Sequence, residues 1–172
     1  MKYSITGYKS GLGKELYKTL GGFGIDKVDG KDITKPYEWI QDALDTDVFI
    51  NNAYDGFSQV NLLEIFYKQW KHLNKTIVNI SSCAADLDFL YQKNLLYPIH
   101  KKSLDNACIR LQNTNSNVRV LNIKVGWMDT PMSSEFTEEK LSTEYVASKI
   151  IECVDDKNVK SITIGDIGSW KS

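Results

Sequence analysis

Short apolar runs rich in β-branched and aromatic residues alternate with segments of helical periodicity along the whole chain. The runs predict strands over residues 2–6, 24–30, 47–51, 75–81, 118–125 and 161–165. Apolar residues at helical spacing predict a helix from Leu12 to Leu20 and further helices over 37–44, 60–73, 98–111 and 142–154. This alternation indicates an α/β domain with a mostly parallel sheet and right-handed crossovers.

Local signals mark several of the predicted helix ends. Gly21 and Gly22 follow the first helix, where glycine is a common stop signal. Pro98 stands at a first helical position, where the N–H that proline lacks would have no partner. Ser142 or Thr143 can cap the last helix with a side-chain oxygen. These signals support the helical pattern independently of its periodicity.

The composition is ordinary for a globular protein of 172 residues, with 42% hydrophobic and 25% charged residues. The length fits one domain over residues 1–172. The 21 lysines and arginines nearly balance 22 aspartates and glutamates, and neither sign forms blocks, which argues against nucleic-acid and membrane-surface partners. No apolar run approaches the ~20 residues that span a bilayer. Met1 leads directly into a strand pattern, so no signal peptide is expected.

Cysteine and histidine usage points away from disulfides and metals. Cys83, Cys108 and Cys153 are odd in number and lie far apart, which favours reduced thiols and a cytoplasmic location. His72 and His100 are the only histidines, and no cysteine or carboxylate spacing completes a ligand set around them. No metal is therefore expected.

The segment after the first predicted strand is rich in glycine. It reads "TGYKSGLG", with Gly7, Gly11 and Gly13 between a strand and an amphipathic helix. Ligands of parallel α/β sheets lie beyond the carboxyl ends of the strands, and a glycine turn there lets a pyrophosphate approach the helix N-terminus. The pattern predicts nucleotide binding, with a purely structural turn as the alternative.

Acidic residues follow the second predicted strand. Asp29 lies 22 residues beyond Gly7, close to where a carboxylate binds the ribose hydroxyls of a dinucleotide. The alternative is that Asp29 and Gly30 simply form a turn. Asp32, in the triplet "DIT", can reach the adenine amino group. The next strands are followed by "NNAY" (51–54), "SSCA" (81–84) and "VGWMDTPM" (125–132).

Together these motifs resemble those of the short-chain dehydrogenase/reductase family. The matching pieces are the glycine turn, "DIT", "NNAY", "NISS", Tyr97-x-x-x-Lys101 and "VGWMDTPM", in the family's order and along nearly the whole chain. The resemblance implies an unusually compact member with a single NAD(P)-binding Rossmann-fold domain, a doubly wound parallel sheet in three α/β/α layers. It also implies a homodimer or homotetramer that pairs through helices 60–73 and 98–111.

The same resemblance implies roles for individual residues. Tyr97 would be the proton donor and acceptor, Lys101 its partner, Ser82 the holder of the substrate oxygen, and Asn61 the anchor of a relay water. The cofactor would contact Gly7, Ser10, Gly11, Leu12, Gly13, Asp29, Asp32, Ile33, Asn52, Ala53, Tyr97, Lys101, Met128 and Thr130.

The chemistry of carbonyl reduction asks for a tyrosine and a lysine of this kind without reference to any family. A phenol with a pKa of about 10 is a poor base at neutral pH, and a nearby ammonium favours the phenolate. Lys101 follows Tyr97 by one helical turn and so lies on the same helix face. Ser82 can donate to the developing oxyanion. The alternative is an ordinary surface pair of Tyr97 and Lys101.

The sequence departs from the family pattern near the expected nicotinamide. Tyr54 replaces a glycine, so its side chain must point away from the cofactor, stack on it or block it. Ser82 precedes Tyr97 by 15 residues, a long interval that leaves Ser81 as a competitor. Val125 replaces a proline. His100 is expected on the surface or in an interface, because a helix turns it off the active face.

Other parts of the chain are shorter than in the family. The helix between strand two and "KDIT" is missing, and residues 133–143 take the place of the substrate lid, with Phe136 as an apolar closure. Tyr91, Trp127 and Met132 can line the substrate pocket or belong to the core. The pocket is expected to be open, or completed by another subunit.

The sequence therefore predicts an NAD(P)-dependent oxidoreductase that acts on a small alcohol or carbonyl compound. The alternative is a dinucleotide-binding sensor or scaffold without turnover. NAD is expected as the cofactor, because the charge of Asp29 would repel a 2′-phosphate. NADP remains possible, because Lys9 could attract that phosphate.

Overall fold

The computed structural model describes residues 1–86, 95–134 and 139–165. Tyr91 and Phe136 therefore lie outside the described residues. Within these ranges, one parallel sheet has the strand order β2-β1-β3-β4-β5-β6. Its strands are β1 (Tyr3–Thr6), β2 (Phe23–Ile25), β3 (Val48–Asn51), β4 (Thr76–Ser82), β5 (Arg119–Val125) and β6 (Ser161–Ile164).

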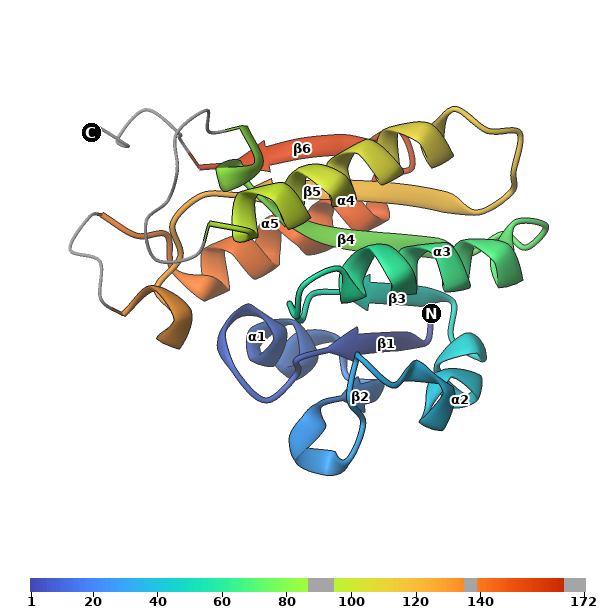
Figure 1. The fold of residues 1–172 in the computed structure, drawn as a ribbon, viewed down its shortest axis with the longest axis horizontal. Helices are drawn as coiled ribbons and strands as arrows, with labels where there is room; N and C mark the ends of the chain where they lie inside the picture. Colours follow the sequence, from blue (N-terminus) through green and yellow to red (C-terminus); the bar gives the residue numbers. More distant parts are fainter. Residues whose placement is uncertain (87–94, 135–138, 166–172) are drawn as a thin grey trace.

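Helices cover both faces of the sheet. They are α1 (Gly11–Leu20), α2 (Ile40–Leu44), α3 (Ser58–Trp70), α4 (Tyr97–Gln112) and α5 (Thr143–Asp155). Figure 1 shows α3 and α4 in front of the sheet and α5 behind it, with the carboxyl ends of the strands at the left. The strand order reverses between β1 and β3, which is where doubly wound folds bind their ligands.

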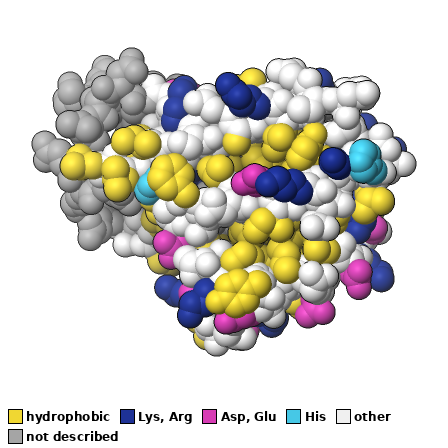
Figure 2. All heavy atoms as spheres, turned by 45° about the vertical axis from the view of Figure 1, so that its right-hand side comes forward, with side chains coloured by type: hydrophobic (Ala, Val, Ile, Leu, Met, Phe, Trp, Pro, Cys, Tyr) yellow, Lys and Arg dark blue, Asp and Glu magenta, His cyan; other side chains and the backbone are white. Residues whose placement is uncertain are grey.

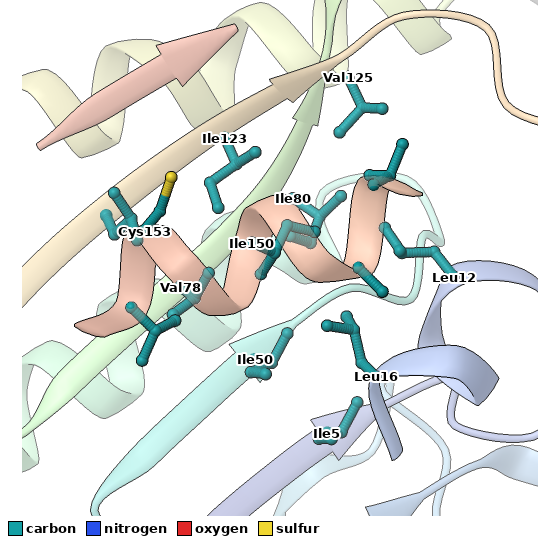
Figure 3. Packing of buried hydrophobic residues seen from close by; sticks show 14 of the residues in the cluster. Ile5, Leu12, Leu16, Ile50, Val78, Ile80, Ile123, Val125, Ile150 and Cys153 are labelled. Atoms are coloured by element: carbon teal, nitrogen blue, oxygen red, sulfur yellow. The ribbon is translucent and has the colours of Figure 1, made fainter. Parts of the chain in front are cut away.

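The layer behind the sheet packs an aliphatic cluster against α1 and α5. Ile5, Ile50 and Ile123 from three strands face Leu16 and Ile150 from the two helices, and all five are fully buried (Figure 3). Burying one such side chain contributes about 1.5–3 kcal/mol. The cluster thereby fixes α1, and with it the turn that precedes α1, against the sheet.

The opposite layer is built around aromatic residues. Phe49 of β3 stacks on Phe66 of α3 with ring centroids 3.7 Å apart, and Trp70 meets Phe66 edge-on at 4.8 Å. Leu104 of α4 completes the same buried cluster. This packing sets α3 and α4 side by side over the sheet, with their first turns at the carboxyl ends of the strands.

The predicted alternation of strands and helices is confirmed, with one strand clearly misplaced. Residues 24–30 were expected to form a strand, but β2 ends at Ile25 and a 3₁₀ turn covers Lys27–Asp29. The side chain of Asp26 accepts a hydrogen bond from the backbone N–H of Val28 at 3.1 Å, which turns the chain out of the sheet. The last helix is capped by Ser142, whose Oγ accepts from the N–H of Tyr145 at 3.2 Å.

No helix in the described part of the chain is both long and apolar enough to cross a membrane.

Candidate active site

A cleft of about 440 Å³ lies at the carboxyl ends of the strands, a size typical of small-molecule sites. Most predicted site residues line it: Gly7, Ser10, Gly11, Leu12, Asp32, Ile33, Asn52, Ala53, Ser82, Tyr97, Lys101, Met128 and Thr130. Three others, Gly13, Asp29 and Asn61, are not among its lining residues.

The glycine turn closes tightly against the end of β3. Gly7 and Gly11 have φ angles of +69° and +50°, which favour glycine. A side chain at Gly13 would overlap the carbonyl oxygen of Gly7, so this glycine acts through packing rather than by lining the cleft. The backbone N–H groups of Asn52 and Ala53 each donate to Thr6 Oγ1 at 2.8 Å, which ties the ends of β1 and β3 together.

The first turn of α1 faces this cleft without a side-chain cap. The N-cap residue Ser10 makes no capping hydrogen bond with its side chain. The first N–H groups of a helix have no partner within the helix, and their partial positive charge favours an anion. The glycine turn and this helix end therefore suit a phosphate group.

Asp29 does not occupy the place expected for a ribose-binding carboxylate. Its side chain accepts from Tyr8 Oη at 2.6 Å and forms an ion pair with Lys9, and these contacts lower the pKa of Asp29, with Lys9 the larger cause. The residues that line the cleft after β2 are Asp26 and Lys27. The predicted strand ran to residue 30, but β2 ends at Ile25, four residues before Asp29. Asp26 is therefore the first carboxylate beyond the strand.

Asp32 and Ile33 lie at the same end of the cleft, as expected. Asp32 Oδ1 accepts from the backbone N–H and the hydroxyl of Thr34, both at 2.8 Å. These two hydrogen bonds, the backbone one first, lower the pKa of Asp32. The carboxylate is therefore charged at neutral pH and held in one orientation.

The segment after β5 reaches back to the glycine turn. Thr130 packs closely against Gly11: a Cβ added to this glycine would lie only 3.2 Å from the Thr130 side chain. Ser133 holds the segment in shape by donating its hydroxyl to the carbonyl of Met128. Met128, Thr130 and Met132 line the cleft together with Val125. Met132 was expected either in the substrate pocket or in the core, and in the structure it lines the cleft.

Ser82 and Tyr97 meet in the cleft where β4 ends and α4 begins. Ser82 ends β4 and Tyr97 begins α4. Burial raises the pKa of the Tyr97 phenol to about 12, and a hydrogen bond with Ser82 acts in the opposite direction. Ser81 also lines the cleft, but its buried Oγ finds no partner among the described residues. Ser82 is therefore the serine that contacts the phenol.

Lys101 lies one helical turn beyond Tyr97 and is almost completely buried, with 3% of its surface exposed. Its Nζ donates to Gln59 Oε1 at 2.7 Å and to the carbonyl of Ile80 at 2.8 Å. Burial lowers the pKa of Lys101 to about 7. The Nζ is 5.5 Å from the centre of the Tyr97 ring. The ammonium is thus held by Gln59 and Ile80, and burial raises the pKa of Tyr97, where a lowering by Lys101 was expected.

Asn61 is not brought to the site. It is exposed on α3, whereas Gln59, two residues earlier, is buried against Lys101. The helix was predicted from residue 60, but α3 begins at Ser58, which places Gln59 inside its first turn. Sequence reasoning missed Gln59 for this reason, and because its partners lie on β3, β4 and α4.

Tyr54 lies against Tyr97. Their rings meet edge-on, with centroids 4.8 Å apart and an angle of 77°. The Tyr54 hydroxyl is 2.8 Å from His100 Nδ1, and the His100 ring packs on Phe57 at 4.4 Å. His100 is partly exposed and lies off the face of Lys101, as expected, but it also holds the aromatic residue beside the phenol.

Searches of protein-family models and of curated proteins find no match for this sequence. Solved structures are similar in fold. A short chain dehydrogenase from Burkholderia cenocepacia J2315 in complex with NADP is 17% identical, with a TM-score of 0.77 over 96% of this chain and 90% of that chain. An alcohol dehydrogenase from the archaeon Thermococcus sibiricus, complexed with 5-hydroxy-NADP, is 15% identical, with a TM-score of 0.74 over 100% of this chain and 99% of that chain.

A third similar structure is the 3-ketoacyl-(acyl-carrier-protein) reductase from Brucella melitensis complexed with NADH. It is 16% identical, with a TM-score of 0.71 over 95% of this chain and 96% of that chain. The chain has the Rossmann fold of the short-chain dehydrogenases/reductases. The resemblance predicted from the motifs is thus confirmed at the level of the fold.

Proposed function

We propose that the protein is an NAD(P)-dependent oxidoreductase that transfers hydride between a nicotinamide and a small alcohol or carbonyl compound. The observation that carries the proposal is the meeting of Ser82, Tyr97 and Lys101 in one cleft with the glycine turn. The similar solved structures support it, because they are dehydrogenases and reductases with NADP or NADH bound.

The residues of the cleft fit a nicotinamide dinucleotide. The glycine turn and the uncapped start of α1 suit its pyrophosphate, and Thr130 and Met128 lie across the turn where the nicotinamide amide would be held. Asp32 and Ile33 would contact the adenine. When bound, the nicotinamide would supply or accept the hydride.

Tyr97 would transfer the proton. With a pKa raised to about 12, its phenol is protonated at neutral pH and is therefore an acid rather than a base. Ser82 holds the phenol and can donate to the same substrate oxygen. The arrangement as it stands favours donation of a proton to a carbonyl-derived oxygen. Alcohol oxidation would require the ammonium of Lys101 to turn towards the phenol.

Asp26 would bind the adenosine ribose and favour NAD. It is the first residue after β2 and lines the cleft. A carboxylate there accepts hydrogen bonds from ribose hydroxyls and repels a 2′-phosphate. Lys27 lines the cleft beside it and would favour NADP. We expect the carboxylate to dominate, because placing a phosphate beside an anion costs more than a solvent-screened lysine returns. Lys9, the residue that left NADP as the alternative, is paired with Asp29.

The test of the proposed activity is the loss of reduced-nicotinamide absorbance with a panel of small carbonyl compounds. The wild type should turn over at least one compound, and Tyr97→Phe should lose that turnover. Tyr37→Phe is the matched control, because Tyr37 is 73% exposed and lies outside the cleft. Equal turnover by the wild type and Tyr97→Phe would contradict the proposal.

The alternative function is a dinucleotide-binding sensor or scaffold without turnover. The observation in its favour is Tyr54, which His100 holds edge-on against the proposed acid. Under this alternative, calorimetry would detect cofactor binding by the wild type, while the carbonyl panel would give no turnover. Tyr54→Gly should then leave the protein inactive, whereas a merely blocked enzyme would gain activity.

The proposed assembly is a homodimer or homotetramer that pairs through α3 and α4. Figure 2 shows hydrophobic side chains at several places on the surface. Leu73, Ile99 and Ile109, on or just after these helices, are 44%, 52% and 54% exposed. Two-fold pairing would bury such residues against their own copies. Sedimentation should show a species heavier than 19.6 kDa, and Ile109→Glu should convert it to the monomer.

A further inference from the structure

A chain of buried amide side chains connects the centre of the sheet with Lys101. Its members are Asn79 of β4, Asn51 of β3 and Gln59 of α3, each at most 2% exposed. Asn51 Nδ2 donates to Asn79 Oδ1 at 2.9 Å and to the backbone carbonyl of Gln59 at 2.8 Å. Burying polar side chains costs free energy unless they are hydrogen-bonded, so a buried network of this kind suggests a specific role.

The network fixes the orientation of the Gln59 amide. Its Nε2 donates to the carbonyls of Asn51 at 2.8 Å and Ile80 at 3.1 Å. Backbone carbonyls only accept hydrogen bonds, so the amino group must face them. The oxygen is therefore left facing Lys101, whose Nζ donates to it at 2.7 Å.

Among the described residues, the groups around Lys101 give it no ion pair. From its own helix, Tyr97 and Asp105 face it, and from the segment after β3, Tyr54 does. Asp105 accepts from Asn122 at 2.8 Å and pairs with Lys124 at 3.2 Å. Within the ranges that the structure describes, α3 and β4 offer Nζ only neutral oxygen acceptors.

We propose that Gln59 is a positioning residue whose fixed amide oxygen holds the Lys101 ammonium beneath Tyr97 and sets the pH at which Lys101 loses its proton. A hydrogen-bond acceptor favours the charged form of a buried lysine, which burial alone disfavours. The catalytic consequence rests on the proposed function, whereas the effect on Lys101 itself does not.

The experiment is NMR titration of Lys101 in protein whose lysine side chains carry ¹³C at Cε, with Lys101→Met to assign the signal. Gln59→Met removes the amide but keeps the length of the side chain. Gln69→Met is the matched control, because Gln69 is exposed on the same helix. Gln59→Met should lower the titration midpoint by about one pH unit, and Gln69→Met should leave it unchanged.

A midpoint in folded Gln59→Met equal to that of the wild type would overturn the proposal. If circular dichroism shows that Gln59→Met does not fold, Gln59→Glu decides, because a carboxylate beside the ammonium should raise the midpoint. An unchanged midpoint in Gln59→Glu would then overturn it. The titration needs neither cofactor nor turnover. An inactive wild type with the expected shift refutes only the proposed activity, and an active one without the shift refutes only the role of Gln59.

Discussion

The molecule contains two neighbouring pairs of a tyrosine and a lysine, Tyr8 with Lys9 and Tyr97 with Lys101, and the two pairs differ in burial and in their charged partners. At one end, Tyr8 and Lys9 both contact Asp29 at the surface, and this carboxylate raises the pKa of each. At the other end, Tyr97 is half-buried and Lys101 is almost completely buried. Desolvation raises the pKa of Tyr97 to about 12 and lowers that of Lys101 to about 7.

The difference shows how surroundings assign chemistry to identical residue types. Lys9 has a carboxylate partner and solvent, so its charge is constant near neutral pH. In the described part of the chain, the acceptors of Lys101 are neutral, so the cost of desolvating its charge lowers its pKa to about 7. Perturbed groups in a cleft are candidates for catalysis, and of the two pairs Tyr97 and Lys101 meet that description.

The largest expected effect is the loss of the phenol. Tyr97→Phe should lower kcat by about 10²–10⁴-fold, because only the proton-transfer hydroxyl is removed, and cofactor affinity should be nearly unchanged. Tyr8→Phe should leave kcat at the wild-type value. Steady-state kinetics and calorimetry measure both quantities. Comparable losses in the two variants would show that Tyr97 is not distinguished from Tyr8 by its chemistry.

The next effect concerns the two lysines. Lys101→Met should weaken both turnover and cofactor binding, by about 10–100-fold each, because hydrogen bonds from a charged group are lost. Lys9→Met should change neither by much, since its charge is already neutralised by Asp29. The same kinetic and calorimetric measurements apply. A loss of cofactor affinity in Lys9→Met alone would place the cofactor's phosphate against Lys9.

The third effect separates the two carboxylates. Asp26→Ala should shift the ratio of NAD to NADP affinity towards NADP by about tenfold, as expected for the loss of one charge-assisted contact. Asp29→Ala should leave that ratio unchanged, because Asp29 lies outside the cleft lining. Calorimetry with both oxidised cofactors provides the test. The reverse result would restore Asp29 as the ribose-binding residue.

The last effect is a pH dependence of stability. The pKa of Lys101 is about 7 in the folded protein and near 10.5 in the unfolded chain, so the unfolded chain binds more protons between these values. Stability should therefore rise with pH in this window, by at most about 1.4 kcal/mol per pH unit, and this rise should be absent in Lys101→Met.

Lys9 should change stability with pH in the opposite direction to Lys101. Because Asp29 raises the pKa of Lys9, its contribution to stability is fully present below the ordinary lysine pKa and is lost only above it. Urea denaturation of the wild type, Lys101→Met and Lys9→Met between about pH 7 and pH 9 compares the three curves. Parallel curves for the wild type and Lys101→Met would mean that Lys101 keeps its charge in the folded state throughout.

The features predictable from sequence are those with local signals. Apolar runs and helical spacing predicted the sheet and its helices, and Tyr97 and Lys101 were predicted as neighbours because one helical turn separates them. The placement of Ser82 beside Tyr97 followed from its position at the end of a predicted strand.

Two of the features missed, the roles of Gln59 and Tyr54, depend on contacts between distant segments, whereas the end of β2 depends on a local turn. The end of β2 is set by the hydrogen bond from Val28 to Asp26, and moving this end by a few residues exchanges Asp29 for Asp26 at the cleft. Gln59 gains its role from β3, β4 and α4 together. The orientation of Tyr54 depends on His100, 46 residues away. The spacing of residues along the chain does not predict contacts between residues so far apart in the sequence.

The contact between Gly13 and the carbonyl of Gly7 also limits how this sequence can vary. Any side chain at position 13 would push α1 away from β1, and α1 packs on α5, which packs on the sheet in turn. A substitution there would therefore displace the whole layer formed by α1 and α5, rather than remove a single contact to a ligand. We expect position 13 to tolerate no other amino acid in a random library selected only for folding, before any selection for activity is applied.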